Sequence, residues 1–137
     1  MKHGLVKTVA VIILVPIMAA CAGHPPETSL EEKLAQRGYT LGQQVRSVFN
    51  FQLNGWSSVD REHVIMNFGA SRYYLLSLRT SCDGLLSATL INFSTTAGSL
   101  TDKDKLLVRN DSHHLSQCYI STIHELEKIR QTGDAAS

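Results

Sequence analysis

The chain has 137 residues and a formal net charge of +1, and 43% of its residues are hydrophobic. This length suits one domain with a modest core rather than two domains. The near-neutral charge argues against a nucleic-acid partner, because phosphate binding needs a concentrated basic face. Lys2 and Lys7 supply the basic excess: without the first twenty residues, eleven basic and twelve acidic side chains leave a net charge of −1.

The first twenty residues have the order of a bacterial export signal. Lys2 and Lys7 form a positive segment, residues 8–18 form an apolar run, and two alanines precede the expected signal-peptidase cut. Cys21 follows directly, as in a lipoprotein signal. We therefore predict a signal peptide at residues 1–20 and lipidation of Cys21. Acyl chains, rather than a spanning helix, would then hold the mature protein to a membrane.

Two other interpretations of this segment exist. A transmembrane anchor needs about 20 apolar residues, and this run is about half as long and contains Pro16. A plain secretory signal that ends Ala-x-Ala is the closer rival, but a cysteine directly after Ala20 favours lipidation. Ala22 stands where an aspartate would typically retain a lipoprotein at the inner membrane. We therefore expect an outer-membrane protein that faces the periplasm.

The next segments predict a tether and a helix. Residues 21–28 contain Pro25-Pro26, which favours an extended tether. Ser29 and Glu32 then form a capping box, and Gly38 is a stop signal. We predict a helix of about two turns between them.

From Ser47 onward apolar residues mostly alternate with polar ones, which predicts strands separated by turns such as Asn54-Gly55. The predicted strands are 47–53, 63–68, 72–78, 85–93, 105–109 and 118–122. Gly69-Ala70-Ser71 is predicted to turn the chain between the second and the third, which makes this pair a hairpin. At Ile123 the apolar spacing changes to three and four residues, which predicts a short terminal helix. The single domain is expected at residues 29–131, followed by a disordered tail at residues 132–137.

Cys82 and Cys118 remain once Cys21 is acylated, an even number of cysteines in a chain sent to an oxidising compartment. We predict that they form a disulfide. Two separately buried thiols are the alternative. A redox-active pair is disfavoured because the chain has no Cys-x-x-Cys spacing.

His113-His114, His124, Asp111 and Cys118 lie close together in the sequence and are residue types that bind zinc. Their spacing does not match a zinc site, because adjacent loop histidines tend to point apart and Cys118 is assigned to the disulfide. We therefore predict no metal and leave the role of the His113/His114 loop open.

Catalytic motifs are also missing. Asp60, His63 and one of many serines could form a triad, but no Gly-x-Ser-x-Gly elbow is present. The carboxylate pairs, Asp60 with Glu62 and Asp102 with Asp104, occupy polar stretches typical of solvated loops. No phosphate loop, dinucleotide fingerprint or haem motif is present, so we expect no cofactor and no enzymatic activity.

Aromatic residues are the remaining binding signal. Most are expected in the core of the domain. Trp56 and either Tyr73 or Tyr74 are expected to face outward and form a small exposed patch.

Five segments carry a resemblance to a known family. They are Trp56 with Val59-Asp60, Tyr74–Leu78 leading to Cys82, Leu85-Leu86 with Ala88, Asp104–Val108, and Cys118-x-Ile120-x-x-Ile123. Over about residues 45–127 the chain resembles an uncharacterised family of small exported proteobacterial proteins, often lipoproteins, grouped as a domain of unknown function. The resemblance implies a disulfide-linked, β-rich domain. It implies no catalytic residues, because none is established for that family.

Together these features predict an α+β domain with a small antiparallel, curled or barrel-like sheet of five to six strands, short helices at each end and a Cys82–Cys118 disulfide. We expect a membrane-anchored envelope lipoprotein that binds or supports another envelope protein and is not an enzyme. One alternative is an inhibitor or immunity lipoprotein, although the Ser-Gly-x-x-Tyr motif of the periplasmic lysozyme inhibitors is absent. The other is a cell-envelope hydrolase, which requires Asp60, His63 and a serine within hydrogen-bond reach.

Overall fold

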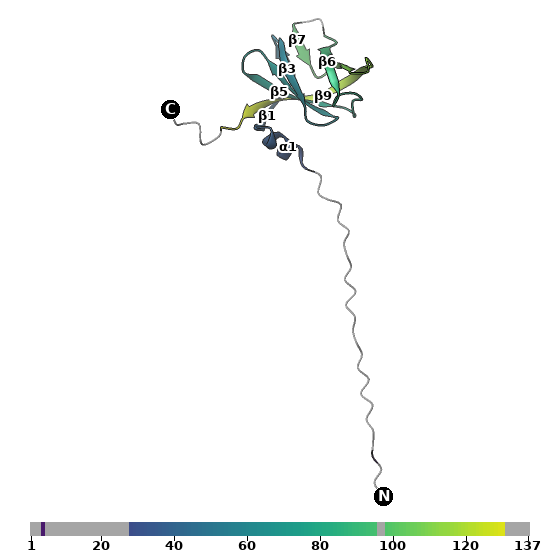
Figure 1. Cartoon of the computed structure of the whole chain (residues 1–137). Coiled ribbons are helices and arrows are strands. Elements are labelled where there is room, and N and C mark those ends of the chain that lie inside the picture. The colour runs from purple at the N-terminus through teal and green to yellow at the C-terminus, as the bar shows by residue number, and fades with distance from the viewer. Residues whose placement is uncertain (1–3, 5–27, 96–97, 131–137) are drawn as a thin grey trace, which may run out of the picture.

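The computed structural model describes residues 4, 28–95 and 98–130, which form one helix and nine strands (Figure 1). The elements are α1 (Leu30–Gln36), β1 (Tyr39–Val45), β2 (Ser47–Phe49), β3 (Leu53–Ser58), β4 (His63–Phe68), β5 (Arg72–Leu78), β6 (Ala88–Phe93), β7 (Ser99–Thr101), β8 (Lys105–Asn110) and β9 (Leu115–Lys128). Apart from Gly4 and Thr28, the predicted signal peptide, tether and C-terminal tail lie outside the described residues. Among the described residues, no helix is long and apolar enough to cross a membrane.

Seven of the strands form one curled antiparallel sheet, a half-barrel in outline (Figure 1). Its main path is β3-β4-β5-β9-β8-β6, and β1 pairs with β9 as a side branch. β9 has fourteen residues. Its first part pairs with β8, its middle with β5 and its last part with β1. This one strand therefore joins the two halves of the sheet, while β2 and β7 form a separate two-stranded sheet.

The main core lies between the inner face of the sheet and the β2–β7 pair. Val48 of β2 and Leu100 of β7 are buried in it. The rings of Phe51, Phe68 and Phe93 also pack there, with centroids 5.7 to 6.3 Å apart. These contacts remove apolar surface from water, which is the dominant favourable term in folding.

A second, smaller core lies on the outer face of the sheet, where α1 packs. Leu34 is fully buried there against Ile65, Leu75 and Leu126. The helix has only seven residues, so it covers part of this face and leaves the rest accessible.

The capping box predicted at the start of the helix is confirmed. Ser29 is the N-cap, and its hydroxyl accepts a hydrogen bond from the Glu32 backbone N–H at 3.2 Å. Gly38 follows the helix with a φ of +86°, a left-handed conformation that glycine adopts without a steric cost. The chain then enters β1.

The end of the chain is a strand, not the helix that was predicted from Ile123 onward. β9 continues to Lys128 and pairs with both β5 and β1. The register on β5 shifts around Ser121, so Ile120 and Ile123 are both buried in the main core, whereas Leu126 is buried in the second core on the opposite face. The spacing of three residues between Ile123 and Leu126 therefore arises because each face of β9 is covered by a core, and not from a helix. The predicted α+β class with helices at both ends is wrong in this respect, because the described chain is mostly β with one short helix.

The strand predicted at 47–53 is confirmed only at residues 47–49, which form β2; β3 begins at Leu53 and contains Asn54-Gly55, which were predicted to be a turn. The chain turns earlier, near Asn50, which has a positive φ of 51°. β1 and the short β7 were not predicted. In β1 the apolar alternation is interrupted at residues 42–44. The strands predicted at 63–68, 72–78 and 105–109 are confirmed as β4, β5 and β8, and β4 and β5 form the predicted hairpin. β6 occupies residues 88–93 of the strand predicted at 85–93.

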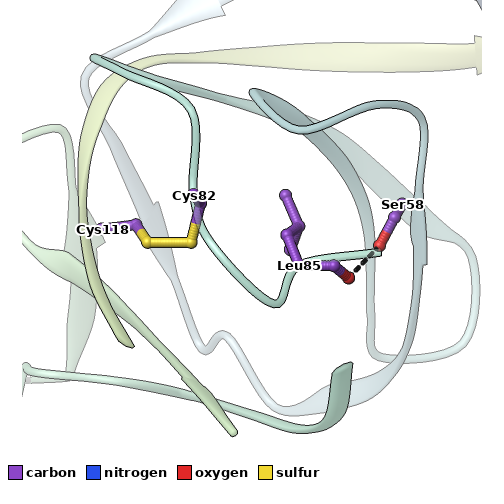
Figure 2. Close-up of a disulfide and its surroundings, with 4 residues drawn as sticks. All are labelled: Ser58, Cys82, Leu85 and Cys118. Atoms are coloured by element: carbon purple, nitrogen blue, oxygen red, sulfur yellow. Dashed lines mark hydrogen bonds between the residues drawn. A yellow bond between two sulfur atoms is a disulfide. The ribbon is translucent and has the colours of Figure 1, made fainter. Parts of the chain in front are cut away.

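Figure 2 shows the predicted disulfide between Cys82 and Cys118, whose Cα atoms lie 5.7 Å apart. The bond fastens the connection between β5 and β6 to β9. Leu85 lies in the same connection; its side chain is buried in the main core, and its carbonyl oxygen accepts a hydrogen bond from the Ser58 hydroxyl at 2.9 Å. The connection is therefore held to β9 on one side and to β3 on the other.

Candidate functional site

An open groove lies on the outer face of the sheet, beside the part that α1 covers. Its volume is about 210 Å³. The lining residues come from four strands and are Tyr39, Gly55, Trp56, Ser57, Ile65, Asn67 and Tyr73. We call this feature the outer-face groove. Gly55 keeps it open, because a Cβ atom at that position would meet no atom within 4 Å.

Aromatic rings form one wall of the groove. The ring centroids of Tyr39 and Tyr73 lie 5.2 Å apart in a tilted arrangement. The Lys128 ammonium lies 4.6 Å from the centroid of the Tyr73 ring, a cation–π contact. The adjacent Tyr73 side chain raises the pKa of Lys128 above its ordinary value. The aromatic wall therefore has a positive charge at its edge.

Asn67 is the polar group of the groove. The strand register places it opposite Gly55 on one side and Tyr73 on the other. Its Oδ1 atom is buried and has no hydrogen-bond partner among the described residues. A buried polar atom without a partner costs about 1–3 kcal/mol. The groove therefore lies beside an amide oxygen whose hydrogen-bonding capacity is unused within the described residues.

The three aromatic residues expected in an exposed patch have different positions. Tyr73 lines the groove, whereas Tyr74 packs against the main core, with its ring centroid 5.7 Å from that of Phe68. Trp56 is partly buried against the main core and lines the groove from the edge strand β3. A third aromatic ring of the groove comes from Tyr39, which was not among the expected residues. The aromatic residues thus form a recessed site rather than a flat patch.

A polar cluster lies at the turn between β3 and β4. Asp60 Oδ1 is 2.8 Å from His63 Nδ1, and Asp60 Oδ2 is 3.0 Å from the Lys33 ammonium of α1. Partial burial opposes ionisation of Asp60. Hydrogen bonds from the Glu62 backbone N–H, His63 and Lys33 outweigh this effect and lower the pKa of Asp60 to about 2. As an anion, Asp60 ties the helix to the turn.

This cluster contains two of the three groups of a serine triad. Ser81 lines the same depression as Asp60 and His63. Its hydroxyl, however, donates a hydrogen bond to Glu62 Oε1 at 3.1 Å. Within the described part of the chain, no serine is hydrogen-bonded to the His63 ring. The arrangement therefore presents no activated nucleophile.

The remaining candidates do not form a site. His113 and His114 lie in the exposed turn before β9. His124 lies ten residues beyond His114, which is about 30 Å measured along the strand. Asp104 accepts hydrogen bonds from the backbone N–H and the hydroxyl of Thr101 and so stabilises the β7–β8 turn. The described ranges contain no group of three or more histidine, cysteine, aspartate or glutamate residues that could hold a metal ion.

Cys118, considered as a zinc ligand, is in the disulfide. Cys21, the predicted lipidation site, lies outside the described residues.

Sequence reasoning missed five of the seven groove residues, which are Tyr39, Gly55, Ser57, Ile65 and Asn67. Asn67 had a usable signal, because it is a polar residue in an otherwise apolar strand with a buried face. Gly55 was assigned to a turn. Tyr39 had no signal, because β1 itself was not predicted.

One family model matches the chain, over residues 2–135, and it describes a family of unknown function (DUF6491). This match confirms the expectation of an uncharacterised family. Searches of curated proteins and of solved structures gave no match.

Proposed function

We propose that this chain, which belongs to the family of unknown function DUF6491, is a lipid-anchored bacterial envelope protein that binds another envelope protein and catalyses no reaction. The observation that carries the proposal is the outer-face groove. It is a recessed aromatic site with one unpartnered polar atom, next to the helix through which the tether enters the domain.

The size of the groove favours a protein partner over a small molecule. Pockets for drug-sized ligands have volumes of about 300–1,000 Å³. The outer-face groove has about 210 Å³, which is small for such a ligand. A single anchoring side chain from a protein suits it better, because buried anchors of this kind supply most of the binding energy at protein interfaces.

The chemistry of the groove narrows the type of anchor. Ile65 and the rings of Tyr39 and Tyr73 favour an apolar or aromatic group. Asn67 Oδ1 requires a hydrogen-bond donor. Tryptophan and tyrosine combine a large apolar ring with an N–H or O–H donor, and both are enriched at interfaces. The proposed partner therefore inserts a tryptophan or tyrosine side chain into the groove.

The proposed attachment is through acyl chains on Cys21. Residues 22–28 can span at most about 25 Å, so the domain would stay close to the membrane surface. With Ala22 after the cysteine, the outer membrane is the proposed location and the domain faces the periplasm.

The hydrolase alternative has one observation in its favour, the contact of 2.8 Å between Asp60 and His63. Ser81 would have to leave Glu62 to complete a triad. We expect His63→Ala to leave partner binding unchanged. A hydrolytic activity on envelope substrates that disappears in His63→Ala and Ser81→Ala would support the hydrolase instead.

Photo-cross-linking in intact cells tests the binding role. A photoreactive amino acid at Ser57, an exposed residue of the groove, is expected to capture one reproducible envelope protein. Gly55→Leu should fill the groove and abolish the cross-link. Asn67→Leu should also weaken it, while raising thermal stability because it removes an unpartnered buried carbonyl. Gln43→Leu, at an exposed β1 position that does not line the groove, is the matched control.

The results separate the roles. Capture that is equally strong in Gly55→Leu and wild type would refute the groove as the binding site. Capture of an enzyme that this protein inhibits would indicate the inhibitor or immunity role. Cell fractionation tests the anchor independently: Cys21→Ala is expected to release the protein from the outer-membrane fraction, and retention after a salt wash would contradict lipidation.

A further inference from the structure

A second surface of the sheet is basic and apolar at the same time. It lies on the outer side of β6, β8 and the first part of β9, away from α1 and β1 (Figure 1). We call it the basic face and define it by Arg79, Leu90, Lys105, Arg109, Leu115 and Tyr119. Its three apolar side chains are about half exposed: Leu90 at 47%, Leu115 at 52% and Tyr119 at 49%. Large exposed apolar side chains that gather in this way mark interaction surfaces.

Strand pairing places cations and apolar groups next to one another. Arg109 of β8 is opposite Leu90 of β6 on one side and Leu115 of β9 on the other. Lys105 is opposite Tyr119. The Lys105 ammonium lies 5.0 Å from the centroid of the Tyr119 ring, and the Arg79 guanidinium carbon lies 5.7 Å from it. Each cation of this surface therefore has an apolar or aromatic neighbour.

The charges of the basic face are not neutralised within the described residues. None of the ion pairs among the described residues contains Arg79, Lys105 or Arg109. The nearest acidic residues along β8 are Asp104 and Asp111, in the turns at its two ends. Asp104 already accepts two hydrogen bonds from Thr101. The surface thus has three positive charges and needs an anionic counterpart.

We propose that the basic face docks on an anionic phospholipid surface, that of the membrane to which Cys21 would be anchored; this inference rests on the proposed lipid anchor. Protein interfaces concentrate apolar residues at the centre and polar ones at the rim. Here leucines and an arginine alternate within a single row, which fits a membrane interface, where cations meet phosphates and apolar side chains enter the acyl boundary.

The length of the tether allows this contact. Tyr119 lies seven residues from Leu126, about 23 Å along β9, and Leu126 packs against Leu34 of α1. Residues 22–28 reach about 25 Å when extended, so the start of α1 can stand off the membrane while the basic face touches it. The anchor raises the local concentration of lipid, so weak binding by the face suffices to orient the domain.

Vesicle flotation of the unlipidated chain that begins at residue 22 tests the proposal. This chain contains every helix and strand that the structure describes. Wild type is expected to float with vesicles rich in phosphatidylglycerol at low salt, and much less with pure phosphatidylcholine. Each lost cation is expected to reduce binding about fivefold, so Lys105→Glu with Arg109→Glu should reduce it by about 20-fold or more. Leu90→Ser with Leu115→Ser should also reduce it. Arg61→Glu with Lys103→Glu makes the same charge change at exposed positions elsewhere and is the matched control.

Three outcomes would overturn the proposal: no flotation with anionic vesicles, equal flotation with neutral ones, or an equal loss in the control pair. If the chain does not bind vesicles but captures an acidic protein, the basic face would be assigned to a protein partner instead. Circular dichroism checks that each variant is folded. Because the assay uses no acyl anchor, failure of lipidation in the Cys21→Ala fractionation and failure of the basic face are separate results.

Discussion

Loss of the Cys82–Cys118 bond is the perturbation whose effect the structure defines best. The two cysteines are 36 positions apart in the sequence, and β6, β7 and β8 all lie between them. In the chain-entropy description, closing a loop of this length lowers the entropy of the unfolded chain and contributes about 4 kcal/mol to stability. A whole domain typically has about 5–15 kcal/mol, so the bond supplies a large share.

Loss of the bond is expected to destabilise some strands of the sheet more than others. Among the described strands, β6 pairs only with β8, and β8 is joined to the rest of the sheet through β9. After reduction, amide hydrogen exchange should accelerate most in β6 and β8 and least in β4 and β5, whose pairing lies outside the closed loop. The melting temperature should fall by about 15 °C or more.

The assay is thermal unfolding of the chain from residue 22, with and without a reductant. Cys82→Ala with Cys118→Ala is the control, because its melting temperature should be low and unaffected by the reductant. A wild-type melting temperature that changes by only a few degrees on reduction would refute the reasoning. Equal acceleration of exchange in all strands would refute the proposed role of the closed loop.

Three further predictions concern stability. The pKa of Asp60, lowered from 3.8 to about 2, implies stabilisation that is present at neutral pH and is lost as the pH falls below about 4. Because the Asp60 side chain is 27% exposed, solvent screening reduces this stabilisation from at most about 2 kcal/mol to about 1 kcal/mol. In urea unfolding measured against pH, Asp60→Asn should remove this part of the pH dependence. Leu34→Ala should cost about 3 kcal/mol in the same assay, because this fully buried side chain attaches α1 to the sheet; a cost below about 1 kcal/mol would contradict that role. Gly42→Ala should cost about 1–3 kcal/mol, since its Cβ would lie 2.8 Å from the Glu125 carbonyl oxygen; unchanged stability would show that the β1 bulge relaxes freely.

The features that were predictable from sequence depend on neighbouring residues. The Ser29 cap, the hairpin through Gly69 and the alternation in β4 and β5 are of this kind, because capping, turn chemistry and side-chain period act over a few positions. The pairing of Cys82 with Cys118 could also be predicted once Cys21 was assigned to lipidation, since the two remaining cysteines allow only one intramolecular bond.

The outer-face groove could not be predicted in the same way. Its lining residues come from β1, β3, β4 and β5, and their contact depends on the order and register of those strands. Register depends on the whole hydrophobic pattern of a sheet, and a shift of one residue moves every side chain to the other face.

The sequence by itself determined the Ser29 cap, the strands β4, β5 and β8 and, with Cys21 set aside, the disulfide partners. Only the tertiary structure decided that the chain from Ile123 is a strand, that Asn54-Gly55 is not a turn, and that Tyr39, Gly55 and Asn67 share a groove. The physical reason is the same in each case. Strand register, including its bulges, decides which face a residue occupies. That register depends on partner strands that are far away in the sequence.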